Sequence, residues 1–164
     1  MKRYAVVDVE TTGASAAHGR VIEIGIVEVP SGRKFHTLVC PDRAVPHWIL
    51  RLTGIDSDEL LGAPSFEEVA PLVRARLHDR VFVAHNASFD LRFLRAEFAR
   101  LGEKFEPEVF CTRNETRRRF PGLGRYDLDT LARQFGIRIA RRHRALDDAL
   151  AAAELLRLCL GRSA

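Results

Sequence analysis

The order of apolar segments along the chain limits its possible folds more than any other feature. Three strand-like segments come first, and helical and strand-like segments alternate after them. Strands followed by alternating helices and strands are typical of an α/β layer structure. The sequence therefore predicts a mixed five-stranded sheet, in which an antiparallel three-strand meander is extended by parallel strands and flanked by helices.

The predicted strands come from apolar runs bounded by turn signals. Residues 4–9 form a short buried run, and residues 21–29 alternate between apolar and other side chains, as in a strand with one covered face. Pro30-Ser31-Gly32 indicates a turn, after which residues 34–40 return as the third strand. The two remaining strands are expected at residues 81–84 and 107–111.

The predicted helices rest on capping residues and on apolar spacing. Ser65 and Glu68 form a capping box for a helix that extends to about residue 77. A second helix begins at Ser88 or Asp90, and its apolar residues recur at helical spacing until Gly102. Further helices are expected at residues 46–52, 127–135 and 144–160.

The length of 164 residues suits a single domain over residues 1–164. The sequence has no run of eighteen apolar residues, so no membrane association is expected. Its three cysteines, Cys40, Cys111 and Cys159, lie far apart without a C-x-x-C pair, which argues against a zinc site and a disulfide framework. This cysteine usage fits a reducing cytoplasm. The net charge of +4 is compatible with a polyanionic partner.

Two acidic residues lie at the end of the first strand. Asp8 and Glu10 are two positions apart, so their side chains share one face of the strand. Neighbouring carboxylates repel each other unless a cation lies between them, and Mg²⁺ and Mn²⁺ prefer oxygen ligands. The pair therefore favours a divalent-metal site, and a solvated strand end is the alternative.

Other chemistry-bearing residues lie near expected helix starts. Asp90 falls in a first turn, where an acid also complements the helix dipole without catalysis. His143 precedes the last helix and Asp148 lies one turn inside it, whereas Asp147 points about 100° away around the helix. His85 is expected to be a structural hydrogen-bonding residue. Taken alone, each of these positions also fits a solvated or structural role.

Together these segments resemble the DEDDh exonucleases, the family of the epsilon-type proofreading subunit of bacterial replicative DNA polymerases. Three ordered motifs carry the resemblance: Asp8-Val9-Glu10-Thr11-Thr12-Gly13, His85-Asn86-Ala87-x-Phe89-Asp90 and His143-x-Ala145-x-x-Asp148. Two intervening segments are also similar, Leu52-Thr53-Gly54-Ile55 and Leu128-Asp129-Thr130-Leu131-Ala132. The resemblance covers nearly the whole chain and implies a ribonuclease H-like fold.

The resemblance also implies a site and a reaction. The reaction is 3′→5′ hydrolysis that releases nucleoside 5′-monophosphates, with two divalent metal ions, Mg²⁺ or Mn²⁺, as cofactors. The implied metal ligands are Asp8, Glu10, Asp90 and Asp148, and the implied general base is His143. The implied substrate-binding residues are Thr11, Thr12 and Gly13 in the terminal-nucleotide pocket, and Leu52, Thr53, Asn86 and Phe89 near the base and sugar.

Two features depart from the family pattern. Cys111-Thr112 stands where many relatives carry Asp-Thr, so this position is not expected to be catalytic. The chain ends at Ala164, whereas an epsilon-type subunit usually continues into a tail that binds clamp and polymerase. We therefore expect that any association with a polymerase would not use a C-terminal docking tail.

Several functions share this pattern. We expect single-stranded DNA 3′ ends as the substrate, in proofreading or repair, and an RNA-directed exoribonuclease of oligoribonuclease or RNase T type is the alternative. The 2′-hydroxyl distinguishes the two substrates, and the sequence shows no selector for it. A non-catalytic nucleic-acid-binding module would predict lost acids, but all five positions are filled. A zinc hydrolase would need a His/Cys cluster that the sequence lacks.

Overall fold

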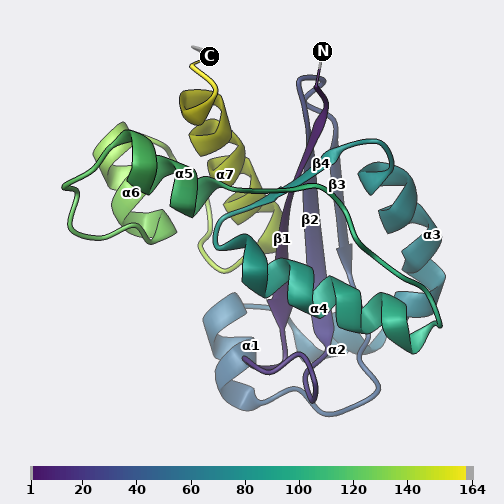
Figure 1. Ribbon diagram of the computed structural model, residues 1–164. Coiled ribbons are helices and arrows are strands. Elements are labelled where there is room, and N and C mark those ends of the chain that lie inside the picture. Colours follow the sequence, from purple (N-terminus) through teal and green to yellow (C-terminus); the bar gives the residue numbers. More distant parts are fainter. Residues whose placement is uncertain (1, 162–164) are drawn as a thin grey trace.

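The computed structural model describes residues 2–161 and contains a central five-stranded sheet (Figure 1). The strand order is β3-β2-β1-β4-β5, in which β1, β2 and β3 are antiparallel and β4 and β5 run parallel to β1. The strands are β1 (Tyr4–Thr11), β2 (Val21–Val29), β3 (Lys34–Leu38), β4 (Val81–Ala84) and β5 (Val109–Cys111). The predicted mixed sheet with an antiparallel meander is confirmed.

Helices cover both faces of this sheet. The helices are α1 (His47–Thr53), α2 (Ser57–Leu61), α3 (Phe66–Leu77), α4 (Ala87–Arg100), α5 (Thr112–Arg119), α6 (Leu128–Phe135) and α7 (Ala145–Cys159). Apolar side chains of α3 and α4 form a core with one face, and those of α7 pack against the other (Figure 1). The helices α5 and α6 pack on α7, and Leu131 and Leu155 are buried between α6 and α7.

Most element boundaries agree with the local sequence signals. The capping box at α3 is present: the Ser65 hydroxyl accepts the Glu68 backbone N–H, and the Ser65 backbone N–H donates to the Glu68 carboxylate. The start of α4 differs, because Asn86 takes the N-cap position with a left-handed backbone (φ 70°). The strand β1 extends to Thr11, two residues beyond the predicted strand, so Thr11 ends a strand instead of beginning a turn.

Two helices were not predicted. The helix α2 is only five residues long, and α5 has the sequence TRNETRRR, which has no apolar periodicity. Its helical conformation follows from tertiary packing against α7, with Thr112 and Thr116 buried. Within residues 2–161, no helix is both long enough and apolar enough to span a membrane.

Candidate active site

Alternation along β1 directs two acids to one face of the sheet. Tyr4 and Val6 belong to the core that β1 forms with α7. Because residues two apart on a strand share a face, as the sequence predicted for Asp8 and Glu10, both acids follow Tyr4 and Val6 onto the α7 side. Both acids are partly buried.

A glycine allows α7 to approach the sheet beside these acids. Gly25 on β2 is paired with Asp8 across the β1–β2 ladder. A Cβ atom at residue 25 would lie 2.5 Å from the Ala145 carbonyl oxygen, and the clash would be with backbone. The missing side chain therefore sets how near the first turn of α7, which carries Asp148, lies to β1.

Glu23 holds the same end of α7. It is fully buried on β2 and accepts hydrogen bonds from the Ala145 backbone N–H (3.0 Å) and from Arg144 Nε (2.9 Å). His36 Nε2 lies 2.6 Å from the same carboxylate. Burial acts to raise the pKa of Glu23, but these hydrogen bonds outweigh burial and lower the pKa. The carboxylate thus satisfies a free N–H group at the helix start, in place of a local N-cap side chain.

Asp90 reaches β1 from α4. It lies buried in the first turn of α4, and its Oδ1 accepts a hydrogen bond from the Val9 backbone N–H (3.0 Å). The preceding Asn86 adopts a left-handed conformation that asparagine tolerates better than most residues. This tight turn from β4 into α4 places Asp90 beside the end of β1.

The segment before α7 supplies the imidazole, and α7 supplies the fourth acid. Asp148 is buried, and its Oδ2 accepts hydrogen bonds from the His143 backbone N–H (3.2 Å) and from Arg142 Nη1. His143 has a left-handed backbone (φ 58°). Glu10, His143 and Asp148 each offer one atom that could bind a metal ion, and these three atoms lie within 4.8 Å of one another. Asp147 pairs instead with Arg141, in agreement with its predicted direction.

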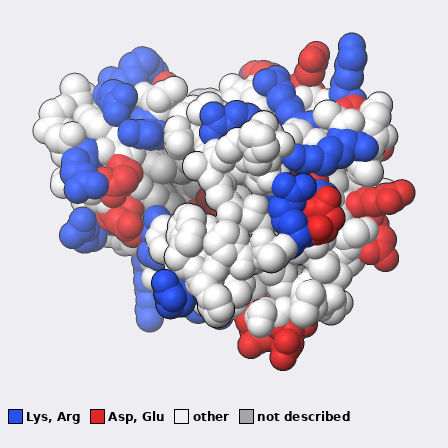
Figure 2. Space-filling model, turned by 90° about the horizontal axis from the view of Figure 1, so that it is seen from below, with Lys and Arg blue, Asp and Glu red and all other residues white. Residues whose placement is uncertain are grey.

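The four acids and the histidine line one pocket of about 460 Å³, which lies where β1 and β4 end. These five residues are Asp8, Glu10, Asp90, His143 and Asp148. Figure 2 views the molecule from below and shows a hollow near the centre of this face, with acidic atoms at its base. The pocket also has apolar lining residues, which include Trp48, Ile49, Leu52, Phe89 and Leu128. A pocket that combines acidic and apolar walls can hold cations and the flat rings of a nucleotide together.

Burial and mutual repulsion raise the pKa of the pocket acids. Burial is the main cause for Glu10, whose pKa rises to about 8, and the nearby Asp148 adds to the shift. Burial also raises the pKa of Asp90 to about 7. The pKa of Asp8 lies well above its usual range because of burial and then of the neighbouring acids. A cation among these groups would relieve their repulsion.

The donor set fits a divalent metal ion. Oδ1 of Asp148 is buried and has no hydrogen-bond partner among residues 2–161, so this oxygen can bind a cation. Carboxylate oxygens are the ligands that Mg²⁺ and Mn²⁺ prefer. Arg142 supplies positive charge to the same acid and also bonds Asp129, with 2.5 Å between Nε and Oδ1.

Five of the seven residues implied for substrate binding line the pocket, namely Thr11, Gly13, Leu52, Asn86 and Phe89. Thr12 and Thr53, both described by the structure, lie outside this lining. The Thr12 hydroxyl accepts the Arg20 backbone N–H (3.0 Å), and the Thr12 backbone N–H donates to the Arg20 carbonyl oxygen (2.9 Å). The Thr53 hydroxyl donates to the Ile49 carbonyl oxygen (2.9 Å). Both hydroxyls thus bind backbone groups in this structure, and the substrate-binding roles of the two threonines stay predictions.

His85 has the structural position that the sequence predicted. Its Nε2 lies 2.9 Å from the Tyr126 carbonyl oxygen, and its Nδ1 lies 3.0 Å from the Thr112 hydroxyl. Burial lowers the pKa of His85 to about 4, so the imidazole is neutral near pH 7. The ring thus connects the end of β4 with α5 and with the segment before α6.

Three residues at or near the pocket were not singled out from the sequence. Trp48 lines the pocket with 54% of its surface exposed, and it precedes Leu52 by one helical turn, which is a signal that periodicity offered. Arg113 lines the pocket from α5, and the lack of apolar periodicity hid that helix. From the sequence alone, Glu23 could be recognised only as an acidic residue within a strand, without a sign of its contact with α7.

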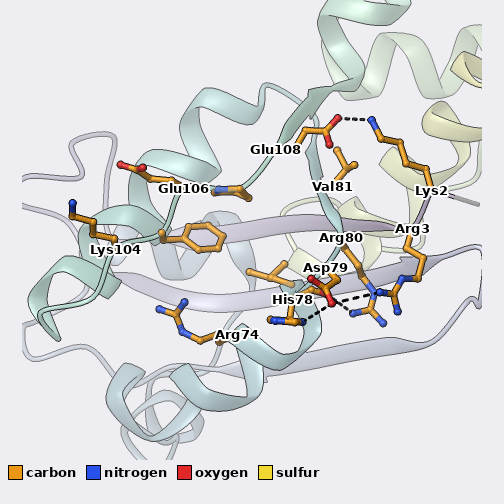
Figure 3. Close-up of a pocket in the computed structure, with 13 residues that line it drawn as sticks. Lys2, Arg3, Arg74, His78, Asp79, Arg80, Val81, Lys104, Glu106 and Glu108 are labelled. Atoms are coloured by element: carbon orange, nitrogen blue, oxygen red, sulfur yellow. Dashed lines mark hydrogen bonds and ion pairs between the residues drawn. The ribbon is translucent and has the colours of Figure 1, made fainter.

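A larger hollow, of about 660 Å³, lies at the opposite end of the sheet, beside the starts of β1 and β4 (Figure 3). Five of its charged or titratable side chains pair with one another: Lys2 bonds Glu108, and Asp79 lies 3.0 Å from His78 and 3.8 Å from Arg3. None of the implied site residues, all of which the structure describes, line this hollow. The smaller pocket is therefore the candidate active site.

The chain is similar to known proteins over most of its length. The family model described as Exonuclease (RNase_T) matches residues 5–156. The chain is 36% identical over 156 residues to DNA polymerase III subunit epsilon of Aquifex aeolicus, across 93% of this chain and 77% of that protein. A PolC-type DNA polymerase III of Caldanaerobacter subterraneus is 38% identical over 155 residues, across 93% of this chain, and the chain spans only 11% of that relative's length.

Solved structures share the fold. Exonuclease X in complex with 5′ overhanging duplex DNA has a TM-score of 0.78 and 29% identity, across 98% of this chain and 92% of that chain. E. coli exonuclease I in complex with a dT13 oligonucleotide has a TM-score of 0.85 at 17% identity, across 99% of this chain and 42% of that chain. The second likeness is one of fold alone.

Proposed function

The chain belongs to the exonuclease (RNase_T) family, and we propose that it is a metal-dependent 3′→5′ exonuclease that releases nucleoside 5′-monophosphates from single-stranded DNA 3′ ends. Family membership confirms the resemblance that three motifs indicated, and the fold is ribonuclease H-like. The observation that supports the activity most is the convergence of four carboxylates and one imidazole in one pocket.

In this proposal four acids hold two divalent ions, Mg²⁺ or Mn²⁺: Asp8, Glu10, Asp90 and Asp148. Bound ions would stabilise the negative charge that develops on the phosphate oxygens during hydrolysis. Without cations, the ionised acids repel a phosphodiester backbone that enters the pocket. The acids therefore make productive strand binding dependent on divalent cations.

His143 is the proposed general base, which takes a proton from the attacking water. Its side chain is partly exposed and lines the pocket, so water can reach it. The bond from its backbone N–H to Asp148 holds the residue beside the acids and leaves the imidazole free to accept a proton. A positioned general base typically contributes roughly 10²–10⁴-fold to a rate.

The pocket residues Thr11, Gly13, Leu52, Asn86 and Phe89 are proposed to contact the terminal nucleotide. DNA is the proposed polymer, because relatives at 36–39% identity are named as DNA polymerase III epsilon subunits and exonuclease X was solved with DNA. The same relatives support association with a polymerase as a further part of the proposal.

One assay tests the proposal. End-labelled single-stranded DNA, duplex DNA and short RNA are each incubated with Mg²⁺, with Mn²⁺ and with EDTA. We expect stepwise shortening of single-stranded DNA from its 3′ end with either metal and no hydrolysis in EDTA. Full activity in EDTA would contradict metal dependence, and faster loss of RNA than of DNA would select the RNA-directed alternative.

Three variants assign the roles in the same assay. Asp8→Asn should abolish hydrolysis by removing a metal ligand, and His143→Ala should slow it by roughly 10²–10⁴-fold. The matched control is Asp147→Asn, because Asp147 is an acid of the same helix turn that pairs with Arg141. An unchanged rate in Asp8→Asn or His143→Ala would remove that residue from its proposed role.

A further inference from the structure

Positive charge is concentrated in one part of the chain. Residues 112–144, here called the basic lobe, comprise α5, α6 and the segments that join them to each other and to α7. The lobe contains ten arginines and three acids, a net charge of +7. Since the whole chain carries +4, the rest of the chain carries −3. The basic pI of the protein thus comes from about a fifth of its length.

Several arginines of the lobe are free to bind an anion. Arg117, Arg133 and Arg138 are exposed and form no ion pair among residues 2–161, whereas Arg118 and Arg119 share Glu115. Arg117 stacks over the Tyr126 ring (5.0 Å to the centroid), which holds its guanidinium on the surface. The lobe therefore keeps unneutralised positive charge on its exterior.

The lobe adjoins the active-site pocket. Arg113 lines that pocket, and its Nε is buried without a hydrogen-bond partner among the described residues. A further hollow of about 480 Å³ lies along α6, and Arg142 lines both this hollow and the active-site pocket. The hollow along α6 is also lined by Arg133, Ile137 and Ile139, so this hollow offers both cationic and apolar contacts.

The two hollows lie next to each other, because Arg142 lines both of them. In Figure 1 the helices α5 and α6 lie to one side of the sheet beyond α7, and Figure 2 shows basic side chains over this side, next to the central hollow. When the terminal nucleotide of a nucleic acid strand fills the pocket, the rest of that strand must extend outside the pocket. Each further nucleotide carries one phosphate. Guanidinium groups bind phosphate in a bidentate manner, and apolar side chains can contact bases.

We propose that the basic lobe binds the phosphate backbone of the nucleotides that follow the terminal one, along the hollow between Arg142 and Arg133. This inference rests on the proposed function. It specifies the substrate as a strand of several nucleotides, because a dinucleotide would end within the pocket and gain nothing from the lobe. An acidic protein surface is the other polyanion that could face these arginines, and the test below separates the two.

The test compares two triple variants with equal loss of charge. Arg117→Ala/Arg133→Ala/Arg138→Ala removes free arginines of the lobe. The control, Arg3→Ala/Lys34→Ala/Lys104→Ala, removes three exposed cations at the opposite end of the sheet. Both are made in a His143→Ala background, so that bound strands persist. Fluorescence anisotropy with Mg²⁺ measures binding of 5′-labelled oligothymidylates of two and twelve nucleotides.

The lobe variant should bind the twelve-nucleotide strand roughly tenfold more weakly than the control, and the dinucleotide equally well. Its plot of log affinity against log salt should be shallower, by about 0.7 for each lost phosphate contact. A matching set of arginine-to-lysine changes should retain most of the slope. Equal thermal midpoints for the two triple variants would show that folding is intact.

Equal binding of the long strand by the two triple variants would overturn the proposal and leave an acidic protein as the partner of the lobe. An equal loss for both strand lengths would also overturn it, because the lobe would then act on the pocket itself. Failure of the proposed function is a separate result: in that case the parent chain would hydrolyse no strand, while the binding comparison would still report on the lobe.

Discussion

The acids Asp8, Glu10, Asp90 and Asp148 lie in a pocket where they repel one another and lose hydration. Asp148 Oδ1 has no partner within residues 2–161, and only Arg142 brings an opposite charge into direct contact with these acids there. Such a site is poorly satisfied by protein groups alone, which is the condition under which a divalent cation is bound most favourably.

The raised pKa of Glu10 and Asp90 predicts how the stability of the metal-free protein depends on pH. Their pKa values of about 8 and about 7 exceed those of the unfolded chain, because burial disfavours the charged forms. Between pH 5 and 8 the folded protein holds protons that the unfolded chain has released. The free energy of unfolding in EDTA should therefore fall as pH rises through this window, as measured by thermal unfolding.

Glu10→Gln provides the check on this prediction. The amide cannot ionise, so the variant in EDTA should lose less stability between pH 5 and 8 and should melt above the parent protein at pH 8. Glu106→Gln, a change to an exposed acid outside the pocket, should leave the pH dependence as it is. Identical curves for Glu10→Gln and the parent protein would contradict the assignment of Glu10 as a protonated acid near neutral pH.

At the scale of elements, the first turn of α7 is fixed by two residues of β2. Gly25 permits the close approach, and Glu23 binds the free N–H of Ala145. The strand β2 thus sets the position of Asp148, although the two segments lie more than a hundred residues apart in the sequence. The N-cap residue of α7, Arg144, makes no side-chain hydrogen bond to the helix start. The buried acid Glu23 of the sheet binds this helix start instead.

Gly25→Ala should damage both stability and activity. The new methyl group would press on the backbone of α7, which is expected to cost about 1–3 kcal/mol. Because Asp148 moves with the helix, hydrolysis should fall by roughly 10²-fold for a shift of about 1 Å. Thermal unfolding and the end-label assay measure the two effects.

Gly62→Ala is the matched control for this change. A Cβ there would make only ordinary contacts, with the nearest atom, the Asp58 carbonyl oxygen, at 3.6 Å. Near-parental stability and activity are therefore expected for the control. If Gly25→Ala behaved like Gly62→Ala, the close approach of α7 would not be what positions Asp148.

At the scale of the whole molecule, metal binding should stabilise the folded state. Only the folded chain brings the four acids together, so the gain follows mass action and is about 2.7 kcal/mol at a hundredfold excess over Kd. For a chain of this size that corresponds to a rise of roughly 5–10 °C in Tm with Mg²⁺ or Mn²⁺. Asp8→Asn should largely lose the rise, and an undiminished shift in that variant would place the binding site elsewhere.

Charge is also distributed unevenly over the whole molecule. The net value of +4 combines a lobe of +7 with a remainder of −3, so overall composition understates the positive field beside the pocket. A polyanion that approached from the side of α5 and α6 would meet this field before it met the acids. The uneven distribution therefore favours entry of a polyanion from the side of α5 and α6.

The sequence by itself determined the elements and their order. The strand at residues 21–29, the capping box at Ser65 and Glu68, and the stop of α6 at Gly136 are local signals, and the structure agrees with each. The single covered face predicted for this strand is wrong, because helices cover both faces of the sheet and all nine residues of β2 are buried. The side-chain period of a strand also determined that Asp8 and Glu10 share a face. These features depend on neighbouring residues only, so they can be predicted without knowledge of the fold.

Only the tertiary structure decided which side chains meet. The contact of Gly25 with α7, the capping of that helix by Glu23 and the position of Trp48 at the pocket all join residues that are distant in sequence. The threonines Thr12 and Thr53 bind nearby backbone, and no sequence pattern separates such a hydroxyl from one that faces a ligand. Long-range packing fixes these contacts, because burial and hydrogen-bond satisfaction are properties of the assembled chain.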